Sequence, residues 1–158
     1  MLTVLNAAAI DFRMTAADGA VVRPADYDSP YLLVFLYNSG CDNCSRSVQR
    51  IVESELLEKA CRNGALRIVS VAVFEEDNRH WKRKAAEFPE GWDNFCDADN
   101  DIVTSPVLDF STVPAFILLD AKRDVAFSDI SMNALLRHLE SDSTFQALLS
   151  PADGTPQP

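Results

Sequence analysis

The stretch from residue 31 to residue 74 constrains the fold of this chain more than any other part. It begins with seven apolar residues in a row, Tyr31-Leu32-Leu33-Val34-Phe35-Leu36-Tyr37. A run of this kind predicts a strand that is covered on both faces. Apolar residues then recur at helical spacing, at Cys44, Val48, Ile51, Val52, Leu56 and Ala60. They predict one helix from Cys41 to about Arg62, ended by Asn63-Gly64.

A second apolar run over residues 66–74 predicts another buried strand. The helix between the two runs is then a crossover connection. Because such crossovers are right-handed and join parallel strands, the two strands are expected to run in the same direction.

Two cysteines stand at the junction between the first strand and the helix, in the sequence Cys41-Asp42-Asn43-Cys44. A dithiol at a strand-to-helix turn is the arrangement that thiol–disulfide exchange requires. Cys41 is expected at the helix N-terminus, where backbone N–H groups and the helix dipole favour the thiolate. Cys44 follows about one turn later, close enough to form a disulfide with Cys41.

Two other interpretations of this cysteine pair remain open. The pair is half of a zinc site if two further ligands come from Cys61, Cys96, His80 or His138, none of which is paired at zinc spacing. It is also compatible with an inert dithiol in a binding module. We favour redox exchange, and we predict no metal and no cofactor.

The rest of the chain completes an α/β pattern. Ile10–Met14 and Val21-Val22 flank a turn at Ala17-Asp18-Gly19 and predict a hairpin. The later segments predict a helix opening at residues 75–78, a short strand around 92–96, a strand over 115–120 with a mate at 125–127, and a final helix over 132–139. This order predicts a three-layer sandwich, with a central mixed sheet and helices on both faces. We expect one domain over residues 1–150 and a disordered tail over residues 151–158.

The charge of the chain limits its partners. The 24 acidic residues outnumber the 14 basic ones and give a net charge of −10. No basic stripe is present, which argues against nucleic acid and anionic membranes. We interpret the acidity as a solvated surface, with a basic partner protein as the alternative. No apolar run approaches the ~20 residues of a membrane span. The first six residues also lack the basic start of a signal peptide.

The order of elements, the dithiol at the first strand–helix junction and Val113-Pro114 before a later strand resemble the thioredoxin fold. The hairpin at Asp11-Phe12 resembles the TlpA/ResA-like extracytoplasmic branch of that superfamily. So does the long segment that holds Trp81, Gly91-Trp92 and Asp97. The resemblance covers about residues 8–141. From this resemblance we also expect a βα-type insertion before the strand that follows Pro114.

The resemblance implies a thiol–disulfide oxidoreductase that needs no cofactor. Cys41 is then the attacking thiol, Cys44 the resolving thiol, and Pro114 a cis-proline that faces the dithiol. The residues expected to contact the substrate are Val113, Pro114, Gly40, Asp42 and Asn43, because the backbone before such a proline pairs with an extended substrate. The implied partners are a disulfide-containing client protein and a redox partner protein. The implied location is the periplasm or the cell envelope.

Two positions depart from the family. Gly40 stands where a tryptophan often precedes the first cysteine, and Phe35 stands where thioredoxin carries a buried aspartate. Because no carboxylate is identified in its place, a binding or assembly module with little turnover is the main alternative function. A peroxiredoxin-type thiol peroxidase ranks lower, because Asn38-Ser39-Gly40 lacks the threonine that such enzymes usually carry before the cysteine.

Local charge indicates the direction of exchange. The Asp42 carboxylate disfavours a thiolate next to it, and no base lies between the two cysteines, Arg46 being the nearest. We therefore predict a modestly lowered pKa for Cys41 and a dithiol that works in the reducing direction.

The remaining cysteines and aromatic residues are assigned to structure. Cys61 is predicted to be a small buried residue, with a Cys61–Cys96 disulfide as the alternative. Trp81 and Trp92 are expected to seal an edge of the core rather than line a substrate groove. His80 and His138 are expected on the surface.

Overall fold

Strand β3 (Tyr31–Tyr37) forms the centre of the fold. The computed structural model describes residues 10–108, 110 and 112–150. All seven residues of β3 are buried, and successive side chains face two different hydrophobic cores. On one side β3 pairs in parallel with β4 (Leu66–Ala72), and on the other it pairs antiparallel with β6 (Ala115–Leu119). The prediction of a strand covered on both faces is therefore confirmed, as is its parallel mate.

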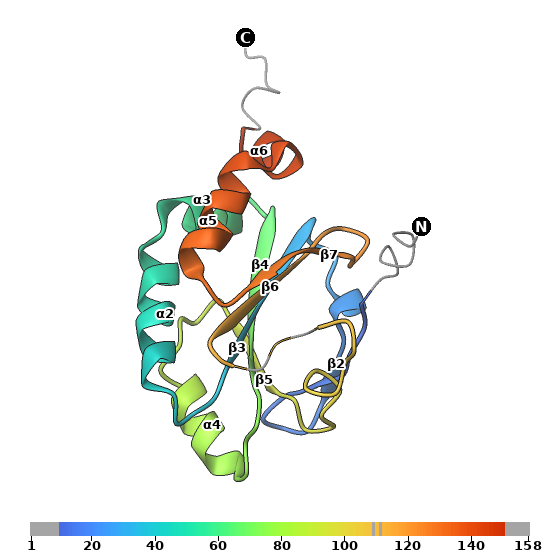
Figure 1. Ribbon diagram of the computed structural model, residues 1–158, viewed down its shortest axis with the longest axis vertical. Helices are drawn as coiled ribbons and strands as arrows, with labels where there is room; N and C mark the ends of the chain where they lie inside the picture. The colour runs from blue at the N-terminus through green and yellow to red at the C-terminus, as the bar shows by residue number, and fades with distance from the viewer. Residues whose placement is uncertain (1–9, 109, 111, 151–158) are drawn as a thin grey trace.

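Four shorter strands complete a mixed sheet in the order β2-β1-β5-β4-β3-β6-β7 (Figure 1). Strands β1 (Met14–Thr15) and β2 (Val21–Val22) form the predicted N-terminal hairpin. Strand β5 (Asp93–Cys96) runs parallel to β4, and β7 (Val125–Asp129) pairs antiparallel with β6. The sequence thus predicted each of these strands, and the α/β class is confirmed.

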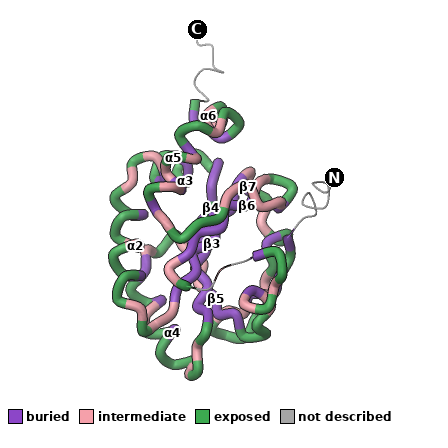
Figure 2. Tube along the Cα trace, in the orientation of Figure 1, coloured by how far each residue is buried: buried purple, intermediate pink, exposed green. Residues whose placement is uncertain are grey.

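The described α-helices cover one face of the sheet (Figure 1). They are α2 (Asp42–Glu53), α3 (Glu55–Arg62), α4 (Asn78–Ala85), α5 (Met132–Ser141) and α6 (Ser143–Leu149). Each contributes buried side chains to the same core, which also holds alternate residues of β3, from Tyr31 to Tyr37. Figure 2 shows β3 in the colour of buried residues. This face therefore positions the N-terminus of α2 against the end of the central strand.

The other face has a different cover. Its core is closed by Phe12 of the N-terminal segment and by Ile102 and Leu108 of the long connection between β5 and β6. Next to them lies Tyr27, directly after the one-turn 3₁₀ helix η1 (Pro24–Asp26). The predicted third layer is present, but in the described residues it contains loops and this short 3₁₀ helix where a second layer of α-helices was expected. Asp97 holds the loop that follows β5, because its buried carboxylate accepts hydrogen bonds from the backbone N–H groups of residues 102 and 103.

The helix predicted from Cys41 to about Arg62 is divided at Ser54, so the prediction of one continuous helix is wrong. Ser54 has an extended backbone, and its Oγ accepts the N–H of Leu57 at 3.2 Å, which begins α3 as an N-cap. The buried residues of the two helices also differ from the predicted stripe. Val52, expected on the buried stripe, is 55% exposed, and Leu57 is buried.

Cys61 also differs from its prediction. It lies exposed in the last turn of α3, because the buried positions of that helix are Leu57 and Ala60. Cys96 is buried in β5, and both are free thiols, so the alternative Cys61–Cys96 disulfide is not formed. Trp81 is buried in the core as expected, and Trp92 packs beside it at the core edge.

A buried guanidinium ties three parts of the chain together. Arg123, 5% exposed, donates hydrogen bonds to the backbone carbonyls of Pro24, Tyr27, Ser29 and Asp120 at 2.7–3.1 Å. These bonds hold the segment around η1 on the β6–β7 turn. In the part of the chain that is described, no helix combines the length and apolarity that a bilayer crossing requires. The predicted tail, residues 151–158, lies outside the described residues.

Candidate functional site

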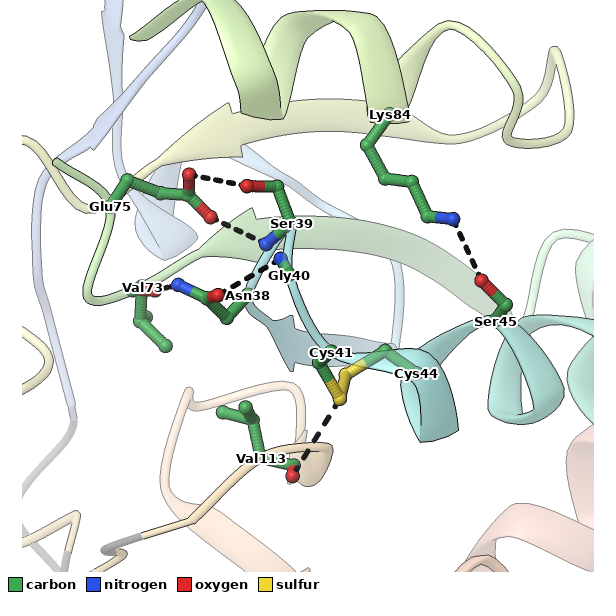
Figure 3. Close-up of a disulfide and its surroundings, with 10 residues drawn as sticks. All are labelled: Asn38, Ser39, Gly40, Cys41, Cys44, Ser45, Val73, Glu75, Lys84 and Val113. Carbon is green, nitrogen blue, oxygen red and sulfur yellow. Dashed lines mark hydrogen bonds between the residues drawn. A yellow bond between two sulfur atoms is a disulfide. The ribbon is translucent and has the colours of Figure 1, made fainter. Parts of the chain in front are cut away.

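Cys41 and Cys44 form a disulfide at the N-terminus of α2 (Figure 3). Their Cα atoms are 5.4 Å apart, within the usual range for a disulfide. Cys41 is the N-cap residue of the helix, and Cys44 lies in its first turn. The two sulfur-bearing residues differ in exposure: Cys44 is 1% exposed and packs in the helix-side core, whereas Cys41 is partly exposed. A solute therefore meets Cys41 first.

The loop before the disulfide is held by Asn38, the first residue after β3. The carbonyl of Asn38 accepts the N–H of Cys41 at 2.9 Å, and its Oδ1 accepts the N–H of Gly40 at 3.0 Å. Its side-chain Nδ2 donates to the carbonyl of Val73 at 2.8 Å, just beyond β4. A Cβ on Gly40 would lie 3.3 Å from Asn38 Oδ1, so glycine suits this tight turn.

A carboxylate that was not identified in the sequence also holds this loop. Glu75 accepts two hydrogen bonds from Ser39, one from the backbone N–H at 2.7 Å and one from Oγ at 2.8 Å (Figure 3). Glu75 follows β4 just as Ser39 follows β3. Because Tyr37 and Ala72 are paired in register, the two loops leave the sheet side by side. Ser39 lies two residues after β3 and Glu75 three residues after β4, and this similar position after two strand ends was the only signal in the sequence.

The negative charge of Glu75 also affects a third thiol, that of Cys96. Cys96 pairs in register with Ala72, which itself pairs with Tyr37 at the end of β3. Burial, with a smaller contribution from the negative charges of Glu75 and Asp97, raises the pKa of Cys96 to about 11. Cys96 is therefore a protonated, buried thiol at neutral pH, unlike the cysteines of the disulfide.

The predicted cis-proline lies across from the disulfide. The Val113–Pro114 peptide bond is cis, and the carbonyl oxygen of Val113 lies 3.9 Å from Cys41 Sγ (Figure 3). The fold thus brings together two segments that are 72 residues apart in the sequence. Gly40, Asp42 and Asn43, the other residues predicted to contact a substrate, are exposed around the same disulfide. Their role in binding stays a prediction.

Aromatic side chains fill the space where thioredoxin carries its aspartate. Phe35 is fully buried, and its ring stacks against Tyr37 at 5.8 Å and Phe116 at 5.7 Å between centroids. Phe88 and Trp92 contact the same ring edge-on. No carboxylate approaches from this strand, as the sequence indicated. Among the described residues, no group of three or more His, Cys, Asp or Glu side chains is placed to hold a metal ion.

Comparison with known proteins gives structural matches only. No protein-family model matches the sequence, and a search of curated proteins finds no match. Among solved structures, a conserved protein of unknown function from Bacteroides fragilis is 28% identical, with a TM-score of 0.75 over 83% of this chain and 95% of that one. A thioredoxin-like protein from Bacteroides caccae is 25% identical, with a TM-score of 0.77 over 87% of this chain and 49% of that one.

A third structure is the thioredoxin domain of a thiol–disulfide oxidoreductase from Bacteroides vulgatus. It is 18% identical, with a TM-score of 0.68 over 84% of this chain and 92% of that one. At that identity the match shows the fold alone. The seven-stranded mixed sheet, the helix that begins at the cysteine pair and these three matches agree. The chain therefore has the thioredoxin-like fold, in which its structural neighbours include thiol–disulfide oxidoreductases from Bacteroides.

Proposed function

We propose that this protein is a thiol–disulfide oxidoreductase of the TlpA/ResA-like kind, which exchanges disulfides with protein substrates. One observation carries the proposal: the Cys41–Cys44 disulfide joins a partly exposed sulfur to a buried one, at a helix N-terminus opposite a cis-proline. That asymmetry suits a two-step exchange, in which one thiol meets the partner and the other resolves the complex. The names of the structural neighbours support the same chemistry.

In the reducing direction the cycle starts from the dithiol form. The Cys41 thiolate attacks one sulfur of a client disulfide, and a Cys41–client bond forms while the client's other sulfur leaves as a thiolate and takes up a proton. The Cys44 thiolate then attacks Cys41 Sγ. This step restores the internal disulfide and releases the second client sulfur as a thiolate. Two electrons pass to the client, and a dithiol redox partner then supplies two electrons that reduce the Cys41–Cys44 disulfide again.

The N-terminus of α2 supplies the thiolate stabilisation that the first step needs. The backbone N–H groups at the start of a helix have no preceding turn to bond, and together with the helix dipole they favour negative charge at the N-cap position, which Cys41 occupies. Asp42 is exposed in the same turn and opposes that effect. This balance supports a modestly lowered pKa for Cys41 and a reducing direction of exchange.

The segment before Pro114 provides a place for the client backbone. Thr112 is exposed and Val113 is half-buried, and the Val113 carbonyl faces the attacking sulfur. An extended client segment that pairs with this backbone places its disulfide beside Cys41. The TlpA/ResA-like resemblance supports a periplasmic or cell-envelope location for this activity.

Reduction of insulin by dithiothreitol tests the proposal. Wild-type protein is expected to accelerate the reaction, and Cys41→Ser is expected to abolish the acceleration. Cys44→Ser is expected to accumulate a mixed disulfide with insulin, visible by mass spectrometry. Cys61→Ser serves as the matched control, because this exposed thiol lies outside the site. Equal rates for wild type and Cys41→Ser would exclude the proposed function.

A further inference from the structure

A groove of about 510 Å³ adjoins the disulfide on the side of the cis-proline. One wall is α2, through Asn43, Arg46 and Arg50, and the other is the start of α5, through Asn133. Val113 and Pro114 also line it, so the groove reaches the backbone that faces Cys41. A segment that enters the site from this side must pass the two arginines.

The charge of the groove is opposite to that of the protein. The chain has a net charge of −10, yet the described lining residues include two arginines and no carboxylate. Arg46 and Arg50 are four residues apart on α2, so both side chains lie on one face of the helix. The groove is therefore a local positive site on an acidic molecule.

In the described part of the chain, four other arginines each have an aspartate partner that these two lack. Arg13, Arg23, Arg67 and Arg79 each pair with an aspartate at 2.7–3.1 Å. Within the described residues, neither Arg46 nor Arg50 has a carboxylate within 4.0 Å, and the Arg50 guanidinium donates only to the neutral Asn133 Oδ1, at 2.5 Å. Both side chains are exposed. A guanidinium can bind a carboxylate through two parallel N–H···O hydrogen bonds.

We infer that the clients of this protein are acidic around the disulfide, with carboxylates that pair with Arg46 and Arg50 when the client cysteine reaches Cys41. This inference rests on the proposed function and names its substrate class. The two arginines select the client through complementary charge, and they act on encounter and orientation rather than on the sulfur chemistry.

Three disulfide peptides of one length test the inference. They differ only in the residues that flank the disulfide, which are Asp and Glu, Asn and Gln, or Lys. Their reduction by the dithiol form is followed as a second-order rate at low ionic strength. The wild type is expected to reduce the acidic peptide about five times faster than the basic one, since exposed ion pairs are individually weak. High salt is expected to reduce the ratio.

The variants Arg46→Glu and Arg50→Glu are expected to reverse that order, and Arg46→Lys is expected to keep it. Arg137→Glu is the matched control. It makes the same change in net charge at an exposed position on α5 outside the groove, and it is expected to keep the wild-type order. If all three peptides are reduced and the Arg46→Glu ratio equals the Arg137→Glu ratio, the charge selection is wrong and the oxidoreductase function stands. If no peptide is reduced by the wild type, the proposed function itself fails.

Discussion

The carboxylate of Glu75 fastens the loop that carries the disulfide, and its removal gives a sharp test of how the site is held. Glu75 accepts two bonds from Ser39, two residues before Cys41, at 2.7 and 2.8 Å. Hydrogen bonds to a charged group each contribute about 1.5–3 kcal/mol. Glu75 is only partly buried, so water can replace part of these interactions at Ser39 when the carboxylate is removed. We therefore expect Glu75→Ala to lower the free energy of unfolding by about 2–4 kcal/mol.

Glu75→Gln separates charge from shape. The glutamine carbonyl can accept the Ser39 N–H, while its amide donates to Ser39 Oγ, which turns to become the acceptor. Both contacts then persist as neutral hydrogen bonds, and we expect a loss of only about 1 kcal/mol. Removing this negative charge is also expected to lower the pKa of the buried Cys96 thiol, because the Glu75 carboxylate is one of the groups that raise it.

The assay is guanidinium denaturation of the oxidised protein, followed by circular dichroism. In a Cys61→Ser background, Cys96 is the one free thiol of the oxidised protein, and its thiolate absorbance across a pH series gives its pKa. Glu76→Ala is the control, since this neighbouring glutamate is exposed and has no hydrogen bond among the described residues. If Glu75→Ala and Glu76→Ala unfold at the same denaturant concentration, the two bonds to Ser39 contribute nothing and the argument is wrong.

Three further perturbations follow from groups elsewhere in the fold. Arg123→Met leaves four backbone carbonyls without their shared donor. We expect the free energy of unfolding to fall by about 3–5 kcal/mol. A loss of less than about 1 kcal/mol in thermal denaturation would contradict this expectation. The Arg13 guanidinium holds the pKa of Asp101 at about 2, below its usual value of 3.8, so this carboxylate stabilises the fold above pH 4 and the stabilisation disappears as the pH falls toward 2. Asp101→Asn should flatten the loss of stability across that interval, and an unchanged slope in acid denaturation counts against the pair. Iodoacetamide at pH 8 is expected to modify the exposed Cys61 of the native, oxidised protein before the buried Cys96, whose pKa is raised to about 11, and mass spectrometry reports the order.

The central strands were predictable because they have strong local signals. Tyr31–Tyr37 is apolar at every position, and only a strand with cores on both faces buries all of them. The site at Cys41 and Cys44 was predictable for a similar reason, since a short motif stands at a strand–helix boundary. Pro114 needed the family resemblance, because a single proline in a sequence does not say which residue it faces.

What the sequence did not predict depends on how distant segments meet. The apolar spacing continues across Ser54, so nothing local separates one long helix from two shorter ones; the serine ends α2 only because its hydroxyl caps α3. Cys61 was misplaced because its helical spacing from Leu57 suggested burial, whereas the buried positions of α3 are Leu57 and Ala60. Glu75 was missed because its partner, Ser39, is 36 residues away and reaches it only once the strands have paired in register.

The burial of Cys44 has a kinetic consequence. Because only 1% of Cys44 is exposed, dissolved thiols and peptides can react with the disulfide only at Cys41. Capture of a partner then depends on the concentrations of both molecules. Its release depends on a neighbour within the same chain and proceeds as a unimolecular event. The rate of this intramolecular release does not depend on the concentration of the protein.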